Sequence, residues 1–269
     1  MKDIKGLADY LRKRFESGEH SSFHFRVSED ESCLTITMDG CIKNGRKHRK
    51  AINILSEILA EYILKSYENS IVEKIINRVC QSLPKTGRDE IYRIACSRLY
   101  SEPLGKGDAI EARKRLIVPK IKEYLESSEV LTLDGFVTFR LGEYVRKLEN
   151  EVDQSIRQYI IERQYEEYIS LLTTFVRMQA PKVPELHVFV LDNGCYKVQG
   201  KSPFDIPKDV TDGFGINEGE PIIENDDFMI GFLLTCAPVK IFIHNASSFR
   251  NKELLNTIRI VFSECVLIN

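Results

Sequence analysis

Apolar residues along the chain recur at helical spacing in some segments and alternate with polar residues in others. Helical spacing between Ile4 and Phe15 predicts an amphipathic helix over residues 3–16. Alternation then predicts two strands that pair as a β-hairpin over residues 23–38. Helical spacing resumes after this hairpin and predicts four more helices, over residues 51–62, 71–79, 88–99 and 108–126.

The middle of the chain combines a Gly-containing turn with a long apolar stripe. Short apolar runs flank Asp134–Gly135, and glycine supplies the positive φ of a tight turn, so a second β-hairpin is expected over residues 130–140. Apolar residues from Val145 to Phe175 then predict one long helix, which should end before Pro181.

The pattern beyond Pro181 predicts a smaller α/β region. A third hairpin is expected around Asp192–Gly194, and the acidic, Gly- and Pro-containing stretch 200–227 reads as a surface loop. Two buried strands, a helix and a last strand should follow, at residues 228–236, 239–244, 251–262 and 265–268. The final strand–helix–strand order predicts a right-handed β-α-β crossover with parallel strands.

These elements together predict an α+β fold in two domains. Residues 1–180 should form an α-rich region with hairpins at 23–38 and 130–140. Residues 181–269 should form an α/β domain with a mixed sheet that ends in the β-α-β unit.

Composition describes an ordinary folded protein and removes several classes of function. The 269 residues are 43% hydrophobic and contain no apolar run near the roughly 18–20 residues that cross a bilayer, so no membrane insertion and a cytoplasmic location are expected. Seven cysteines are spread over the chain without a C-x-x-C pair, so neither a disulfide scaffold nor a metal site is expected. Neither a cofactor nor a catalytic residue is predicted.

Charge is distributed unevenly along the chain. Residues 40–122 carry 18 basic and 9 acidic residues, although the net charge of the whole chain is −2. Either the helices of this block neutralise one another, or the block binds an anionic partner such as nucleic acid. The candidate nucleic-acid contacts are Arg46, Lys47, Arg49, Lys50, Arg113, Lys114 and Arg115.

Known catalytic motifs find no good match. The segment Gly40–Lys47 resembles a P-loop, but Arg46 replaces the lysine and Lys47 replaces the hydroxyl residue, so a structural turn is expected. The acidic residues between Glu218 and Asp227 lack the spacing of a calcium loop.

One position stands out by its place in the predicted topology. His244 and Asn245 follow a strand and precede a helix, where α/β sheets bind ligands and helix N-termini attract anions. They form a candidate anion or partner site. The alternative is that Asn245, Ser247, Ser248 or Asn251 only caps the helix.

Two segments carry a family resemblance. Leu131–Arg140 with the following long helix, and Ala237–Asn245 with the later Glu253-Leu-Leu, are similar to the YtxC-like family of sporulation proteins from endospore-forming Firmicutes. The resemblance implies a bacterial cytoplasmic protein with a role in sporulation. It brings no catalytic residue with it.

Three functions follow as hypotheses. The first is a non-enzymatic, sporulation-associated protein that acts by protein–protein interaction. The second is a nucleic-acid-binding protein that uses the basic block 40–122. The third is a hydrolase or transferase with a site near His244.

Overall fold

The protein has an α+β fold, as predicted. The computed structural model describes residues 4–16, 25–29, 34–38, 45–100, 106–128, 130–202, 205–214 and 222–268. The chain divides into two compact units, Met1–Ile160 and Ile161–Asn269. Helix α7 (Gly142–Met178) runs through this division, and its side chains contribute to the cores of both units. The domain boundary expected at residues 180–181 stays a prediction.

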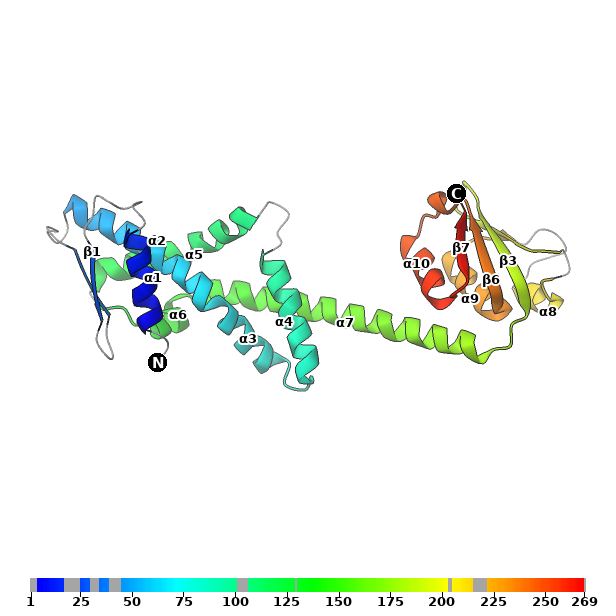
Figure 1. Cartoon of the computed structure of the whole chain (residues 1–269), viewed down its shortest axis with the longest axis horizontal. Coiled ribbons are helices and arrows are strands. Elements are labelled where there is room, and N and C mark those ends of the chain that lie inside the picture. The colour runs from blue at the N-terminus through cyan, green and yellow to red at the C-terminus, as the bar shows by residue number, and fades with distance from the viewer. Residues whose placement is uncertain are drawn as a thin grey trace. The chain divides into compact units, whose positions relative to one another are not determined.

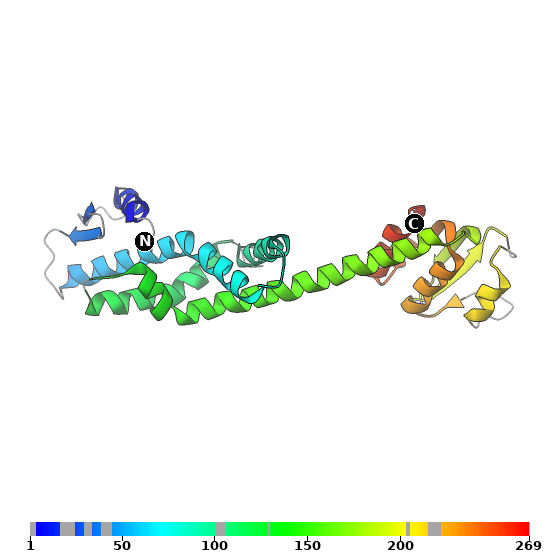
Figure 2. The same ribbon diagram turned by 90° about the horizontal axis from the view of Figure 1, so that it is seen from below.

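The N-terminal unit is a set of helices with one small hairpin (Figures 1 and 2). Strands β1 (Phe25–Glu29) and β2 (Leu34–Met38) are antiparallel, as predicted for 23–38, although residues 23, 24 and 33 lie outside the described residues. The helices are α1 (Ile4–Glu16), α2 (Arg46–Ser66), α3 (Glu68–Val79), α4 (Lys85–Tyr100), α5 (Lys106–Ser127), α6 (Leu133–Arg140) and the first part of α7. Helix α1 contacts both β1 and α2.

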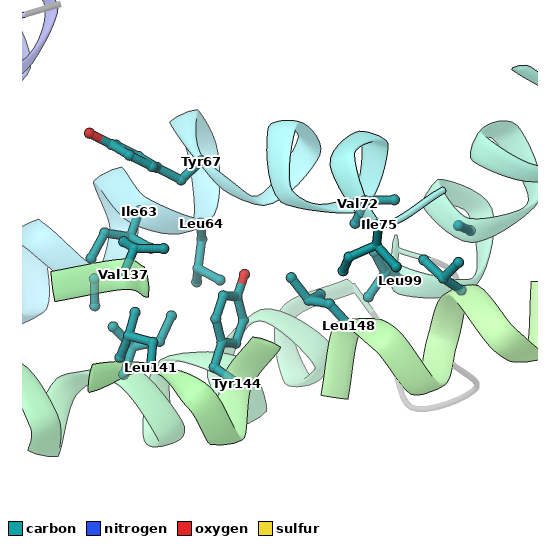
Figure 3. Packing of buried hydrophobic residues seen from close by; sticks show 14 of the residues in the cluster. Ile63, Leu64, Tyr67, Val72, Ile75, Leu99, Val137, Leu141, Tyr144 and Leu148 are labelled. Carbon is teal, nitrogen blue, oxygen red and sulfur yellow. The ribbon is translucent and has the colours of Figure 1, made fainter. Parts of the chain in front are cut away.

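Aliphatic side chains from α2 to α7 form the core of this unit. Ile63 and Leu64 of α2 meet Val137 of α6 and Leu148 of α7 in one buried cluster (Figure 3). Tyr144 points from α7 into the same cluster and is 1% exposed (Figure 3). Burial of this apolar surface is the main force that holds the helices together.

A buried ionic network lies beside the apolar cluster. Glu68 and Arg113 are 1% and 3% exposed, and Arg113 Nε lies 3.0 Å from Glu68 Oε2. The hydroxyls of Tyr144 and Tyr100 donate to the same carboxylate at 2.6 and 3.0 Å. Arg113 Nη1 also donates to the backbone oxygen of Leu99 at 2.7 Å. The network therefore links α3, α4, α5 and α7. Burial raises the pKa of Tyr144, and the negative charge of Glu68 raises it further.

The hairpin predicted at 130–140 is wrong, because Leu133–Arg140 forms helix α6. Thr132 begins the helix in an extended conformation, and its backbone oxygen accepts from Phe136 N at 2.8 Å. Asp134 lies in the first turn, where its charge suits the helix dipole. Phe136 and Val137 are consecutive in the sequence and both are buried. A helix packed on a core can bury two consecutive residues, whereas a strand would point them to opposite faces.

The C-terminal unit contains a five-stranded sheet in the order β5-β4-β3-β6-β7, of which Figure 1 labels β3, β6 and β7. Its elements are β3 (Val183–Val190), β4 (Tyr196–Gly200), α8 (Lys208–Gly213), β5 (Ile222–Ile223), α9 (Asp226–Cys236), β6 (Pro238–His244), the 3-10 turn Ala246–Ser248, α10 (Lys252–Val261) and β7 (Cys265–Ile268). Strands β3 and β4 form the predicted hairpin, with Gly194 at φ 90° in its turn. Strands β6 and β7, which precede and follow α10 along the chain, pair with each other in parallel, as predicted.

The strand predicted at 228–236 is also wrong, because this segment belongs to helix α9. The side chain of Asn225 accepts from Phe228 N and caps the helix, and Ala237 ends it in the left-handed region at φ 41°. Met229, Phe232, Leu233 and Cys236 are buried at helical spacing. The stretch expected to be a loop at 200–227 contains α8 and β5.

The Glu68–Arg113 pair gives the first prediction. Arg113→Met should lower the free energy of unfolding of the N-terminal unit by about 3–5 kcal/mol, because Glu68 would be left buried without its cation. The double variant E68Q/R113M should recover at least about 1 kcal/mol of this loss, since no charge then remains unpaired. Urea unfolding followed by circular dichroism measures both.

Arg78→Met is the matched control, because its partner Glu149 lies at 2.6 Å but Arg78 is 65% exposed. Loss of this surface pair should cost less than about 1 kcal/mol. Equal losses in the two single variants would contradict a structural role for the buried network.

Candidate functional site

The helices of the C-terminal unit pack against one face of its sheet. Alternate strand residues such as Leu186, Val188 and Ile243 share one buried cluster with Phe232 of α9 and Ile258 of α10. Side chains alternate between the two faces of a strand, so the intervening residues lie on the opposite face. Five of them are the half-buried residues Glu185, His187, Phe189, Phe242 and His244. This opposite face, named here the open sheet face, is the candidate functional surface.

Two rows of aromatic side chains cross the open sheet face. In the parallel pairing of β3 and β6, His187 lies opposite Phe242 and Phe189 lies opposite His244. The rings are nearly parallel in both pairs: the centroids are 4.8 Å apart for His187 and Phe242, and 4.2 Å apart for Phe189 and His244. Val266 and Ile268 of β7 extend the two rows.

The two imidazoles join the rows. His187 Nδ1 and His244 Nε2 are 2.9 Å apart, so one nitrogen donates and the other accepts. Partial burial lowers the pKa of His244, and the positive charge of a protonated His187 lowers it further. The hydrogen bond requires at least one neutral imidazole, because two imidazolium ions would leave no acceptor nitrogen.

Lysines border the aromatic rows. Lys240 Nζ lies 5.1 Å from the ring centroid of Phe242, and Lys197 lies opposite Phe189 in the pairing of β3 and β4. Lys201 lies 3.5 Å from Glu185 at the far end of the face. The open sheet face thus combines stacked aromatic side chains with neighbouring lysines.

The comparisons with known proteins agree with one another. The profile of the YtxC-like family matches residues 53–267. This chain belongs to the YtxC-like family. It is 23% identical over 175 residues to the "Uncharacterized protein YtxC" of Bacillus subtilis (strain 168), and the match covers 61% of each chain, less than two thirds of the relative's length. No solved structure matches the chain.

In this YtxC-like chain, the two residues of the predicted anion or partner site, His244 and Asn245, make different contacts. His244 lies on the open sheet face, whereas α10 packs on the other face. Asn251 caps α10, since its side chain accepts from Leu254 N at 3.0 Å. Asn245 donates to the backbone oxygen of Val190 at 3.3 Å. Asn251 thus caps α10, and His244 is hydrogen-bonded to His187, while the anion or partner site at His244 and Asn245 stays a prediction.

The basic residues proposed as nucleic-acid contacts are divided by the fold. Arg113 is buried against Glu68, so it cannot contact a phosphate. Lys114 is 12% exposed and lies 3.1 Å from both Glu57 and Glu61. Burial alone would lower the pKa of Lys114, but these two carboxylates outweigh it and raise the pKa. Exposed positions are occupied by Arg115, Arg46, Lys47, Arg49 and Lys50.

Chemistry elsewhere in the described chain is sparse. A pocket between α3 and α4 has a volume of about 380 Å³ and is lined by both acids and bases, among them Glu73, Arg88 and Asp89. Burial raises the pKa of Cys236 to about 12 and that of Cys265 to about 11, so these thiols are poor nucleophiles. The residues that the structure describes contain no group of three or more potential metal ligands.

The acidic cluster and the P-loop-like segment fall partly outside the described residues. Glu218, Glu220 and Gly40 are not described. The carboxylate of Asp226 accepts two hydrogen bonds within the fold, from the hydroxyl of Tyr196 at 2.6 Å and from Asn251 Nδ2 at 2.7 Å.

No described helix has the length and apolar character of a membrane span.

His187, Phe189 and Phe242 were not predicted as site residues from the sequence. Their signal was the alternation itself, because each of these strands carries aliphatic residues at one parity and aromatic residues at the other. The pairing of β3 with β6, which joins residues 55 positions apart, was not visible in the sequence.

The imidazole pair predicts a pH dependence of stability. Since the pKa of His244 is lowered in the folded chain, the unfolded chain binds the proton more tightly, and stability should fall as the pH drops below about 6.5. His244→Gln should remove part of this loss. The measurement is the difference in urea midpoint between pH 7.5 and pH 5.5 for the two proteins.

His48→Gln is the control for this experiment, because His48 lies in α2 of the other unit. It should leave the pH dependence unchanged. A native chain and a His244→Gln variant that lose equal stability would show that the imidazole pair does not titrate as described.

Proposed function

We propose that this chain is a non-catalytic binding protein of sporulating bacteria, and that its open sheet face holds a protein partner. The observation that carries the proposal is the pair of stacked rows His187–Phe242 and Phe189–His244, which lie on the sheet face opposite the one that the described helices cover. Its place in sporulation rests on the family resemblance.

The chemistry of the open sheet face supports recognition over catalysis. Its two imidazoles are hydrogen-bonded to each other and stacked on phenyl rings, an arrangement that fixes their positions. A general base needs a substrate proton within reach and an aligned nucleophile. Aromatic side chains, in contrast, are typical of the centres of protein interfaces.

Charge supports a protein partner over a nucleic acid at this face. Residues 161–269 contain ten basic and fifteen acidic residues, a net charge of −5, which repels phosphates. One face of each ring is also occupied by its stacked neighbour, which leaves less ring surface for bases than the aromatic side chains of single-strand binders offer. Lys240, beside Phe242, favours a partner that presents an apolar segment bordered by a carboxylate.

The test is affinity capture with the full chain from sporulating cells of the source organism. The native chain should retain a defined protein, and F189S/F242S should retain at least about tenfold less, because central aromatic residues carry most interface energy. The binding of the purified candidate is then measured by calorimetry with both chains.

F228S/I260S is the matched control, because Phe228 and Ile260 are 54% and 48% exposed on the helices of the same unit. It should bind like the native chain. Equal retention by all three proteins, or no protein retained above background by the native chain, would refute the proposal.

A second candidate function is nucleic-acid binding by the N-terminus of α2. Arg46, Lys47, Arg49 and Lys50 are exposed in the first turns of this helix, and its first turn contains no acidic residue. The positive end of the helix dipole adds to their charge.

Salt dependence separates the two candidates. A phosphate-binding surface of four cations should lose affinity by roughly 10²-fold or more between 50 and 200 mM salt, and R46E/K47E/R49E/K50E should abolish binding. Fluorescence anisotropy with labelled DNA and RNA measures it. The charge reversal R88E/R93E is the control, since both arginines lie on α4. Absence of binding at 50 mM salt would eliminate this candidate.

A further inference from the structure

The second half of α7 carries apolar side chains in two adjoining stripes. One of these stripes packs against the core of the C-terminal unit. Ile169, Leu172 and Val176 pack against the core of the C-terminal unit. The hydroxyl of Tyr165 lies 3.0 Å from Thr257 Oγ1 of α10, a hydrogen bond that fixes the rotation of the helix. The other stripe therefore has a set direction, away from this core.

The second stripe is strongly exposed. Ile161, Leu171 and Met178 are 65%, 70% and 82% exposed, and Tyr168 and Phe175 are 45% and 53% exposed. Five large apolar side chains in a row within eighteen residues are unusual on the surface of a soluble chain. Such a stripe usually marks an interface.

The spacing of this stripe identifies the kind of partner. Its positions are separated by three and four residues in strict alternation: Ile161, Gln164, Tyr168, Leu171, Phe175 and Met178. This is the heptad pattern of a coiled-coil seam, whose partner is another helix with the same pattern. Charged residues lie off the seam, and the ion pair of Arg163 with Glu166 at 3.0 Å belongs to the opposite side.

We infer that the partner of this seam is the α7 helix of a second copy of the chain. The alternation of three and four reads the same in both directions, so two antiparallel copies would set Ile161 opposite Met178, Gln164 opposite Phe175 and Tyr168 opposite Leu171. Every seam residue then meets a seam residue of the other copy, which is the self-complementarity that a twofold dimer requires.

The available area agrees with a dimer. From their exposed fractions, the five apolar side chains offer on the order of 700 Å² per chain, close to the roughly 800 Å² per partner of a standard protein interface. The seam on α7 and the open sheet face on β3 and β6 share no residue, so the inferred dimer does not depend on the proposed function.

Sedimentation velocity of the full chain between 1 and 100 µM tests the inference. The native chain should sediment as a species of twice the 31.0 kDa chain mass. L171E/F175E should sediment as a monomer, with a dissociation constant raised at least about 100-fold, because each new carboxylate would be buried opposite an uncharged seam residue, Tyr168 or Gln164 of the other copy. V79E/I260E, which alters two exposed apolar residues outside the seam, should stay a dimer.

Gln164→Leu gives a test that does not depend on loss of folding. It replaces the single polar seam residue by an apolar one and should tighten the dimer about tenfold, as removal of a polar core residue does in coiled coils. A native chain that stays monomeric at 100 µM, a dimeric L171E/F175E variant, or a Gln164→Leu variant with unchanged affinity would overturn the inference.

Discussion

The helices of the C-terminal unit reach its sheet from one side, and this constraint decides what the other side can be. Met229 and Phe232 of α9, Ile258 of α10 and Leu172 of α7 all belong to a cluster with the strand residues of one parity. None of the described helices shares this cluster with the half-buried residues of the other parity, His187, Phe189, Phe242 and His244. A sheet covered on one face normally shows polar residues on the other, yet here that face carries stacked aromatic rings. The open sheet face is therefore the feature on which the proposed partner binding depends.

Some of the basic residues that are dense in the sequence of the N-terminal unit pair with acidic residues of the same unit. Arg113 pairs with Glu68 inside the helical core, and its guanidinium also lies 5.4 Å from the ring of Tyr100. Lys114, its neighbour, turns toward Glu57 and Glu61 of α2. Of the two basic clusters, the one at 113–115 thus serves mainly to hold α5 against α2, α3 and α4, as the neutralisation alternative expects.

Elements with a long, regular period were predictable from the sequence, whereas short apolar runs were not. The helices around 51–79 and the long helix to residue 178 repeat their pattern over several turns. Leu133–Arg140 and Phe228–Cys236 are too short for periodicity to distinguish a helix from a strand. Their caps carried the missing signal: Asn225 before Asp226 and Asp227 is a helix start, and Asp134–Gly135 lies in a helical first turn rather than a hairpin.

The candidate site was half predictable for a related reason. His244 was identified from its place after a strand, which needs only local order. His187, Phe189 and Phe242 gain their meaning from the parallel pairing of β3 with β6, and the intervening β4, β5, α8 and α9 separate these two strands along the chain. The role of Arg113 likewise depends on Glu68, 45 positions earlier, whose burial local spacing cannot show.

Chemical modification of histidines in a purified complex tests the open sheet face most directly. Diethyl pyrocarbonate modifies accessible imidazoles, and mass spectrometry reports each site separately. If the open sheet face holds the partner, His187 and His244 should react several-fold more slowly in the complex than in the chain alone, while His48 should react equally in both. Unchanged reactivity of His187 and His244 in a stable complex would contradict the account, because the partner would then lie elsewhere.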